Sequence, residues 1–466
     1  MKAETAGGAW ARSDSKIGSG RRLAVLLILT ILNPALRTGA NDGRCHLPGG
    51  RHPEGSSREA LVISYEVREH VVIISAGGPD AGRGGGAGGR IVAVPIERAA
   101  ISSQIRLFRQ LIVTRSPLCR EIGRSLFETL IAPVLPNLTA AQSLRIIPDD
   151  ILWELPFQAL VTPDGGYLIE TVPILYLPSR EALGVADDPR GDGLSPDSDL
   201  LLAVGSPLPA NKRGLRQPGD HPAFSPLPEA VLEAKIIAGV HGERRSEVLT
   251  GRSATESAFR RLAPKRRFIH LATHGVIDNR NPHRSHLLLT PSGTDPANDG
   301  RLEVQEVRQL QLVAELAILA ACETGRGSNE ARDPGDRMTG LGHAFLEAGC
   351  RAVIVSLWKI DSRRTAELVS LFFQIWHDDG GQGSMGMALA LRLTSLRMMR
   401  NQATRHPYYW AGMSVVARQL REKKERHHLA PIDAKRAARK SHTFWKRLLP
   451  PVLTLRICIF CDSGKK

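Results

Sequence analysis

Two residues of this chain have the types and spacing for nucleophilic chemistry: His274 and Cys322, which lie 48 residues apart. A cysteine is a competent nucleophile as its thiolate, and a nearby imidazole can favour that form or protonate a leaving amine. The residue after the histidine is Gly275, whose N–H is unobstructed. Together with the amide of Cys322, it could bind the oxyanion of a tetrahedral intermediate. The alternative for Cys322 taken alone is a structural thiol, because free cysteine is among the most buried residue types.

Three apolar segments are suited to carry these residues to one edge of a sheet: 267–275, 314–322 and 351–358. Their apolar runs are nearly continuous rather than alternating, which is typical of strands buried on both faces of a parallel sheet. Functional sites in open α/β sheets collect beyond the carboxyl ends of the strands. His274 and Cys322 stand at two of these ends, and "SLWKIDS" follows the third. If the strands are neighbours, a thiol, an imidazole and a polar loop converge there.

Helical patterns separate and follow the apolar segments, and this alternation of strand and helix favours an α/β/α layered fold. The helices expected are 101–133, 229–240, 253–262, 338–350, 363–378 and 385–399. The other strands expected are 60–75 and 90–96, joined as a hairpin by Gly-rich residues 77–89, then 143–149, a strand–turn–strand over 155–170, and 199–207. Ser253 is expected to cap the helix that it opens, with Glu256 completing a capping box.

Several motifs resemble a known family. "FIHLATHG", "LAILAACETGRG" and "GHAFLEAGCRAVIVSLWKIDS" are similar, in this order, to the CHAT domain. Its members are caspase-like proteins related to separases and are often attached to tetratricopeptide repeats. The upstream "LRIIPDDILWELPFQALVTPDGGYLIETVPILYLPS" and the downstream "HPYYWAGMSVV" are also similar to it, so the resemblance covers roughly residues 120–417. Caspase-type peptidases have a histidine about 50 residues before the cysteine, a spacing that this chain matches.

The resemblance implies a caspase-like α/β/α sandwich with a mostly parallel sheet, preceded by a small β-hairpin and helical segment. It puts His274 and Cys322 on the dyad positions of the family. The function that it implies is a cysteine endopeptidase that cleaves protein substrates and needs neither a metal nor an organic cofactor. The alternative is a catalytically silent caspase-like domain that serves as a platform for protein interaction or signalling. Since the attached repeats are absent, a repeat-containing regulator would act in trans.

Other residues near the expected sheet edge have weaker functional signals. Asp336, Trp358 and Asp361 are candidates for substrate binding, and the two carboxylates would suit a basic P1 side chain or would be solvated loop residues. His270 shares a strand face with His274, since residues four apart on a strand point the same way. It is expected to be a packed residue or one that supports the site from behind, rather than a second base. Cys350 and His343 are expected to be structural.

The positive charge of the chain gathers at its ends. The net charge is +15, of which residues 418–466 carry +10, residues 1–59 carry +4, and the middle carries +1. A nucleic-acid-binding protein normally carries its charge on the folded face that docks, so no specific nucleic-acid partner is expected. Six cysteines spread over 466 residues do not form a disulfide framework, and the lone C-x-x-C at 458–461 lacks partners for a zinc site.

The expected organisation has four parts. Residues 1–59 are a disordered segment or signal peptide, 60–119 a β-hairpin and helical lead-in, 120–417 the CHAT domain, and 418–466 a divergent basic tail. The possible signal peptide lies around Arg21–Ala40, where two arginines precede the ten-residue apolar run Leu23–Leu32. This run is too short to span a bilayer, and no other segment is long enough, so no membrane span is expected. The location stays open between cytoplasmic and exported.

Overall fold

The computed structural model describes residues 60–78, 89–134, 143–179, 182, 200–207, 227–278, 280–292, 296–321, 340–358, 362–378 and 383–418. All of them belong to one compact unit of the chain, which ends at Arg421. The expected N-terminal segment, the middle of the Gly-rich connector and nearly all of the basic tail lie outside the described residues. The four-part organisation of the chain therefore stays a prediction.

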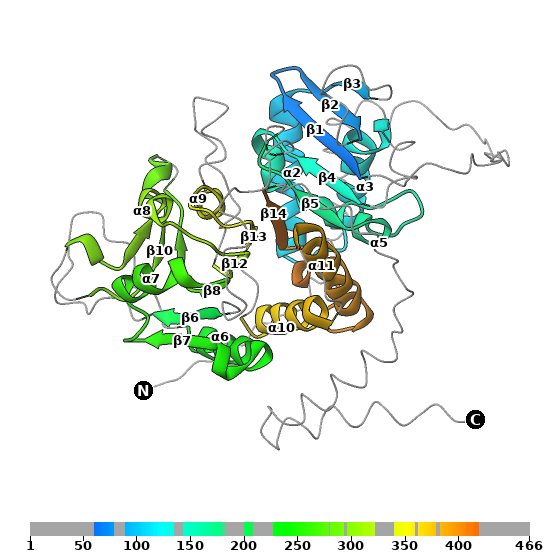
Figure 1. The fold of residues 1–466 in the computed structure, drawn as a ribbon. Helices are drawn as coiled ribbons and strands as arrows, with labels where there is room; N and C mark the ends of the chain where they lie inside the picture. Colours follow the sequence, from blue (N-terminus) through cyan, green and yellow to red (C-terminus); the bar gives the residue numbers. More distant parts are fainter. Residues whose placement is uncertain are drawn as a thin grey trace, which may run out of the picture. The chain divides into compact units, whose positions relative to one another are not determined.

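A large, mostly parallel sheet runs through the described unit (Figure 1). In spatial order its eleven strands are β3 (Arg90–Pro95), β2 (Val71–Gly77), β1 (Leu61–Val67), β4 (Leu144–Ile147), β5 (Ile174–Tyr176), β14 (Met413–Ala417), β13 (Ala352–Ser356), β12 (Leu316–Leu319), β8 (Phe268–Ala272), β6 (Leu201–Pro207) and β7 (Ser246–Gly251). Antiparallel pairing is confined to β3–β2, β2–β1 and β13–β14 among these neighbours. The mostly parallel α/β architecture predicted from the sequence is confirmed.

The three strands expected to carry the site are direct neighbours. Strand β12 pairs in parallel with β8 on one side and with β13 on the other. Ile318 lies opposite His270 of β8 and opposite Ile354 of β13, so the three strands share one register. All residues of these strands are buried, as their continuous apolar runs predicted. Their carboxyl ends therefore meet at one edge of the sheet.

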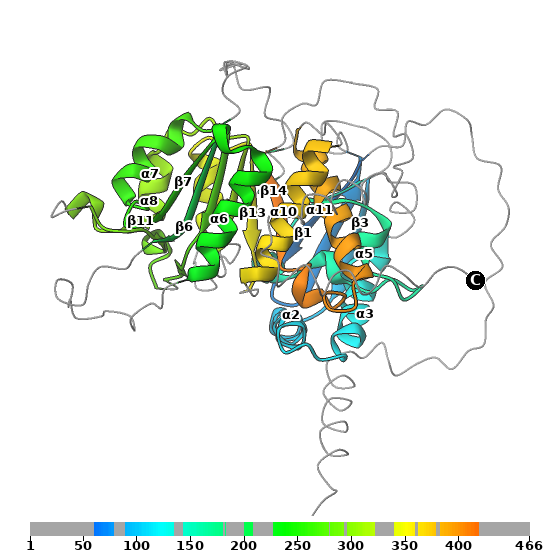
Figure 2. The same ribbon diagram turned by 90° about the horizontal axis from the view of Figure 1, so that it is seen from below.

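Helices cover both faces of this part of the sheet (Figures 1 and 2). The described helices are α2 (Arg98–Val113), α3 (Cys119–Leu130), α5 (Leu168–Thr171), α6 (Pro228–His241), α7 (Glu256–Leu262), α8 (Val304–Gln309), α9 (Leu341–Glu347), α10 (Ser362–Asp378) and α11 (Gly383–Arg400). Helix α6 contacts β6 and β8 and packs against α10, while α9 contacts β13 and packs against α8. Among the described helices, none combines the length and apolarity needed to cross a membrane.

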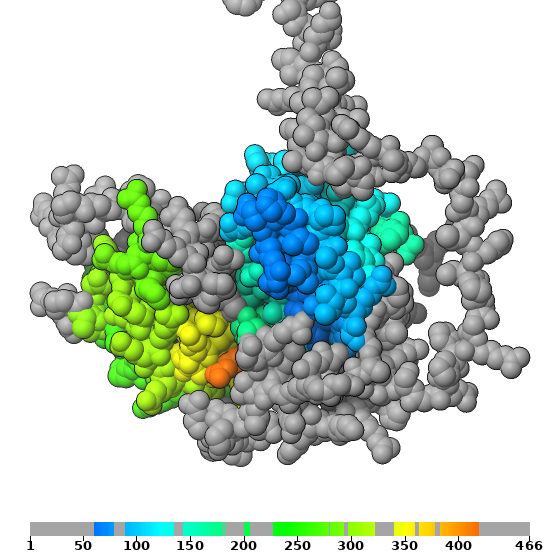
Figure 3. Space-filling view, turned by 90° about the horizontal axis from the view of Figure 1, so that it is seen from above, coloured from blue at the N-terminus to red at the C-terminus, as the bar shows by residue number. Residues whose placement is uncertain are grey.

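The strands before residue 120 are part of the same sheet, because β1 pairs in parallel with β4. Residues 60–75, expected as one strand, form the antiparallel pair β1 and β2. The hairpin expected between this segment and 90–96 is confirmed by the antiparallel pairing of β2 with β3. Figure 3 shows the blue and cyan surface of the strands and helices in this part of the chain as one continuous patch.

Two local expectations are wrong. Residues 155–170, expected as a strand–turn–strand, contain a 3₁₀ turn at Phe157–Ala159, one isolated bridge between Val161 and Tyr167, and the short helix α5. Helix α7 is capped by Thr255 rather than by Ser253: the Thr255 hydroxyl accepts the N–H of Ala258 at 3.2 Å. Contacts of residues 155–170 with distant segments explain the first difference.

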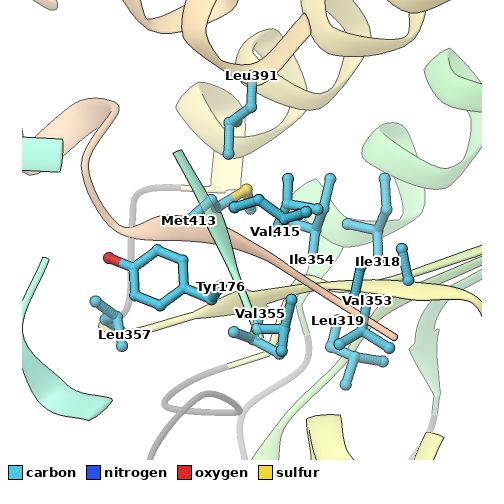
Figure 4. Packing of buried hydrophobic residues seen from close by; sticks show 14 of the residues in the cluster. Tyr176, Ile318, Leu319, Val353, Ile354, Val355, Leu357, Leu391, Met413 and Val415 are labelled. Atoms are coloured by element: carbon cyan, nitrogen blue, oxygen red, sulfur yellow. The ribbon is translucent and has the colours of Figure 1, made fainter. Parts of the chain in front are cut away.

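The hydrophobic core extends along both faces of the sheet. Figure 4 shows side chains of β5, β12, β13 and β14 meeting Leu391 of α11 in its central part. Branched and aromatic side chains from segments far apart in the sequence pack together here. This packing fixes β12 and β13, whose carboxyl ends lie at the edge of the sheet.

A small second sheet follows β8 directly. It contains β9 (Gly275–Val276), β10 (His286–Leu288) and β11 (Arg301–Glu303), in the order β11–β10–β9. Both of its pairings are antiparallel. Only Thr273 and His274 therefore separate the last strand residue of β8 in the large sheet from the first strand residue of β9 in the small sheet.

Candidate active site

His274 lies at the junction of the two sheets, two residues beyond β8 and immediately before β9. Strand β10 holds its backbone, because the N–H of Leu288 donates to the carbonyl oxygen of His274 at 2.9 Å. The hydroxyl of Thr273, a residue only 2% exposed, donates to the carbonyl of Leu288 at 2.5 Å. The imidazole itself is half-buried. His274 is therefore a partly exposed histidine whose backbone is held by Leu288 of β10.

Gly275 presents its N–H on the side of β9 that faces away from β10. Gly275 lies opposite Leu287, and the adjoining pair of His274 and Leu288 carries the inter-strand hydrogen bond. Since successive residues of an antiparallel strand point their amides to opposite sides, the Gly275 N–H is directed away from the ladder. Glycine adds no side chain over that amide. The amide is thus not used by the ladder, and its expected role as an oxyanion donor stays a prediction.

His270 is a packed residue, as its position suggested. It is fully buried, and its Nε2 lies 3.0 Å from Oε1 of Glu233 in α6. Burial raises the pKa of Glu233, and the neighbouring His270 opposes that rise. Because the pair is enclosed between β8 and α6, it joins the helix to the strand and leaves His274 as the histidine at the edge.

The end of β13 is tied into the core by several hydrogen bonds. Trp358 is 3% exposed, and its indole N–H donates to the carbonyl of Tyr408 at 3.1 Å. The hydroxyl of Ser356 donates to the carbonyl of Trp358 at 2.6 Å, and the N–H of Leu357 donates to the carbonyl of Gly412 at 2.8 Å. The Trp358 side chain thus packs inside the protein, and its expected role in substrate binding stays a prediction.

Three of the residues singled out in the sequence lie outside the described residues: Cys322, Asp336 and Asp361. The described chain reaches Ala321, which is 4% exposed, before the first of them. The structure therefore describes the imidazole side of the candidate site and the strand that leads to the thiol. The dyad itself stays a prediction.

Two other cysteines are described, and both are buried free thiols. Burial raises the pKa of Cys350, which lies two residues before β13, and also raises the pKa of Cys119. The Cys119 sulfur lies 3.8 Å from Nε2 of His406, whose Nδ1 accepts the N–H of Tyr408 at 3.2 Å. Since the thiolate is the reactive form, neither cysteine is in an environment that activates it.

Sequence reasoning missed a buried ion pair that reaches the site edge. Nη1 of Arg109 in α2 contacts Oε2 of Glu154, and Nη2 of Arg109 donates to the carbonyl of Leu357 at 2.7 Å. The partners lie 45 and 248 residues away from Arg109 along the chain. No periodic or local pattern carries a signal over such separations.

No cluster of three or more histidine, cysteine or acidic side chains suited to a metal ion occurs among the described residues. The chemistry that the described part of the site supports is proton transfer by an imidazole, with an adjacent backbone donor for an anion.

Compared with known protein families, residues 120–418 match the CHAT domain. The chain belongs to the CHAT domain family. The match begins at the second residue of α3 and ends just after β14, so it includes β8, β12 and β13 with the candidate site. The family expected from the sequence motifs is thus confirmed, over nearly the same residues.

Among curated proteins, this CHAT chain is similar to Tetratricopeptide repeat protein 28. The human protein is 24% identical over 341 residues, which cover 63% of this chain. The mouse protein is 22% identical over the same length. The chain spans 13% of the length of each of these relatives.

Solved structures with a similar arrangement of elements share little sequence with the chain. The separase–securin complex of Saccharomyces cerevisiae matches with a TM-score of 0.47 and 9% identity, covering 78% of this chain and 30% of that chain. The Arg-specific cysteine proteinase gingipain R of Porphyromonas gingivalis matches with a TM-score of 0.39 and 11% identity, covering 69% of this chain and 67% of that chain.

Proposed function

We propose that this CHAT protein is a cysteine endopeptidase in which Cys322 and His274 form the catalytic dyad. The observation that carries the proposal is the position of His274, half-buried at the carboxyl end of β8, beside the strand that leads to Cys322. The register supports it: Ile318 pairs with His270, and Cys322 follows Ile318 by the same four residues that separate His274 from His270. Neighbouring strands lie about 4.8 Å apart, so β8 and β12 end side by side at the sheet edge, a few residues before His274 and Cys322.

The proposed reaction begins with attack of the Cys322 thiolate on the carbonyl carbon of the scissile peptide bond. The carbonyl oxygen becomes an oxyanion, which accepts hydrogen bonds from the amides of Gly275 and Cys322. His274, protonated at this stage, gives its proton to the leaving amine as the C–N bond breaks, which leaves a thioester on Cys322. His274 then takes a proton from water, whose oxygen attacks the thioester, and the carboxyl product leaves as the thiolate reforms.

The substrate side of the proposal is a protein chain. Asp336 and Asp361 are proposed to line a pocket for a basic P1 side chain, in which their carboxylates would pair with the cation. Trp358 would shape this pocket through its place in the core rather than by direct contact. A repeat-containing regulator in trans is proposed because the curated relatives of the chain are tetratricopeptide repeat proteins.

The test is a peptide-library cleavage profile of the full-length protein and of its Cys322→Ala variant. The variant is expected to fold like the parent and to lose cleavage by roughly 10,000-fold or more, because the nucleophile is removed. His274→Ala should lose a similar factor, whereas His70→Ala, at a histidine side chain 76% exposed, should cleave like the parent. Cleavage by Cys322→Ala at the rate of the parent would show that the assignment is wrong.

The alternative is a catalytically silent caspase-like domain that serves as a platform for protein interaction or signalling. The match to a tetratricopeptide repeat protein favours it. A thiol-reactive probe near neutral pH separates the two functions. Selective labelling of Cys322 supports the peptidase, because an activated thiolate reacts faster than an ordinary thiol. Labelling no faster than at the buried Cys119 and Cys350 supports the platform.

A further inference from the structure

Strand β3 forms one edge of the described large sheet, where β2 is its paired neighbour (Figure 1). The side chain of Ile91 in this strand is 73% exposed, the highest value among the large apolar side chains that the structure describes. Ala93 and Pro95, on the same side of the strand, are exposed as well, and residues 91–95 contain no charge. Edge strands are usually shielded by charges, bulges or a covering segment, so this edge is open to another strand.

The hydrogen bonds of the sheet determine which backbone groups of β3 point outward. The N–H of Arg68 donates to the carbonyl of Val71 at 2.9 Å, so Val71 and every second residue after it bond to β1. The alternate residues of β2, beginning with Val72, therefore bond to β3. Val72 lies opposite Val94, so the even-numbered residues of β3 bond to β2. The odd-numbered residues direct their backbone groups away from the sheet: Ile91, Ala93 and Pro95.

Two copies of β3 satisfy these outward groups when they pair antiparallel. With Val92 on a two-fold axis, Ile91 of each copy lies opposite Ala93 of the other, and each such pair exchanges both of its N–H···O=C bonds. Every outward N–H of β3 then has a partner, because Pro95 has no N–H. An axis at Ala93 would set Ile91 opposite Pro95 and lose a hydrogen bond, so the proline favours the first register.

The side chains fit in the same register. On the outer face the large Ile91 lies opposite the small Ala93 of the other copy. On the inner face Val92 meets its own symmetry mate in a non-hydrogen-bonded pair, whose Cα atoms are about 4.5 Å apart. Arg90, the charged residue of β3, lies opposite Val94. No like charges therefore face each other across the two strands.

We propose that β3 is a docking edge for a second copy of this chain, through which the large sheets of two copies join into one. The inference goes beyond the proposed peptidase, since β3 precedes the residues that match the CHAT domain, 120–418. The contact is small, because two six-residue strands bury less than the about 1,200 Å² at which stable interfaces begin. The dimer is therefore weak, with a dissociation constant on the order of 10 μM.

Sedimentation velocity of the full-length protein between about 2 and about 200 μM measures the association, and the parent should shift from monomer towards dimer over this range. Ile91→Lys puts a charge on the edge and should weaken the association at least about 30-fold. The matched control is Ile73→Lys, because Ile73 lies opposite Ala93 on the same outer face but one strand inside the edge. The control should associate like the parent.

Ala93→Pro is an independent variant, because the N–H that it removes points outward and the pairing with β2 stays intact. It should weaken the association as much as Ile91→Lys does. Hydrogen–deuterium exchange resolved to single amides gives a second readout on the parent. The amides of Ile91 and Ala93 should exchange about fivefold more slowly at about 200 μM than at about 2 μM. The amides of Val92 and Val94, which face β2, should exchange equally at both concentrations.

Each contrary result overturns the proposal. A parent that stays monomeric at about 200 μM would leave the edge to a strand of another protein. Equal weakening by Ile91→Lys and Ile73→Lys would place the contact on the outer face rather than on the edge. If a lysine variant melts far below the parent, Ala93→Pro and the exchange of the parent decide. Association of Ala93→Pro at the strength of the parent, or no protection of the Ile91 and Ala93 amides, refutes the pairing. None of these measurements needs cleavage, so failure of the peptidase proposal is detected separately.

Discussion

Glu256, a buried carboxyl at the start of α7, should make the stability of the protein depend on pH. Its side chain is 1% exposed, it accepts the N–H of Gly300 at 2.8 Å, and Nη1 of Arg260 lies 3.3 Å away. Burial raises the pKa of Glu256 from 4.5 to about 7; Glu306 and Asp299 add to the rise, while Gly300 and Arg260 oppose it. Gly300 directly precedes β11, so this carboxyl anchors the small sheet that holds the backbone of His274.

The sign of the effect follows from the direction of this shift. Because the pKa is higher in the folded state, the folded protein binds more protons than the unfolded chain between about pH 4.5 and pH 7. The contribution of Glu256 to stability is complete below this window and is lost as the pH rises through it. A difference of about 2.5 pH units corresponds to a loss of about 3 kcal/mol in the free energy of unfolding.

The substitution Glu256→Gln removes the titration and keeps an oxygen that can accept the Gly300 N–H. Urea unfolding of the full-length protein, followed by circular dichroism at pH 5 and pH 8, measures the free energy of unfolding in each state. Between these pH values the parent should lose more stability than the variant, by up to about 3 kcal/mol. Glu66→Gln is the control, because that side chain is 55% exposed. An equal loss in the parent and in Glu256→Gln would refute the reasoning.

Two further predictions concern cysteines and glycines. In the folded protein at pH 7, Cys119 and Cys350 should react with a soluble maleimide at least about 100-fold more slowly than in urea, because both are buried and burial raises the pKa of each. Mass mapping of labelled peptides measures the two rates, and equal rates with and without urea would contradict the prediction. Gly349→Ala should lower the free energy of unfolding by about 3 kcal/mol or more, since φ is +121° and a Cβ would lie 2.2 Å from the backbone oxygen of Leu312. The control Gly239→Ala, in a helix with open space around the glycine, should raise the free energy of unfolding by up to about 1 kcal/mol. Equal thermal stability of the two variants would contradict this prediction.

The local sequence was sufficient for the framework of the site. Continuous apolar runs marked β8, β12 and β13 as strands of a parallel sheet, because strands covered on both faces need apolar side chains at every position. The motif around His274 then placed a histidine at the carboxyl end of one of these strands. These features depend on residues within one element, so the chain carries them without reference to distant contacts.

The sequence was insufficient to predict local structure where the polar groups of a segment form hydrogen bonds with residues far away in the chain. The local sequence of residues 155–170 predicts a strand–turn–strand. Gln158, in the middle, donates through its amide to the carbonyls of Ala411 at 2.7 Å and Met413 at 3.1 Å. The hydroxyl of Tyr176 donates to the side-chain oxygen Oε1 of Gln158 at 2.8 Å. Because β14 and β5 meet this segment through side chains, it forms a 3₁₀ turn instead of a ladder.

Taken by itself, the sequence determined the family, the mostly parallel α/β architecture and the position of His274 at a strand end, since each depends on short motifs or on the period of apolar residues. Only the tertiary structure decided which strands are neighbours, that β1 joins the sheet before residue 120, and that Arg109 reaches Leu357. The physical reason is the same in each case: hydrogen bonds and ion pairs between segments far apart in the chain are selected by the packing of the whole core, and no local pattern encodes them.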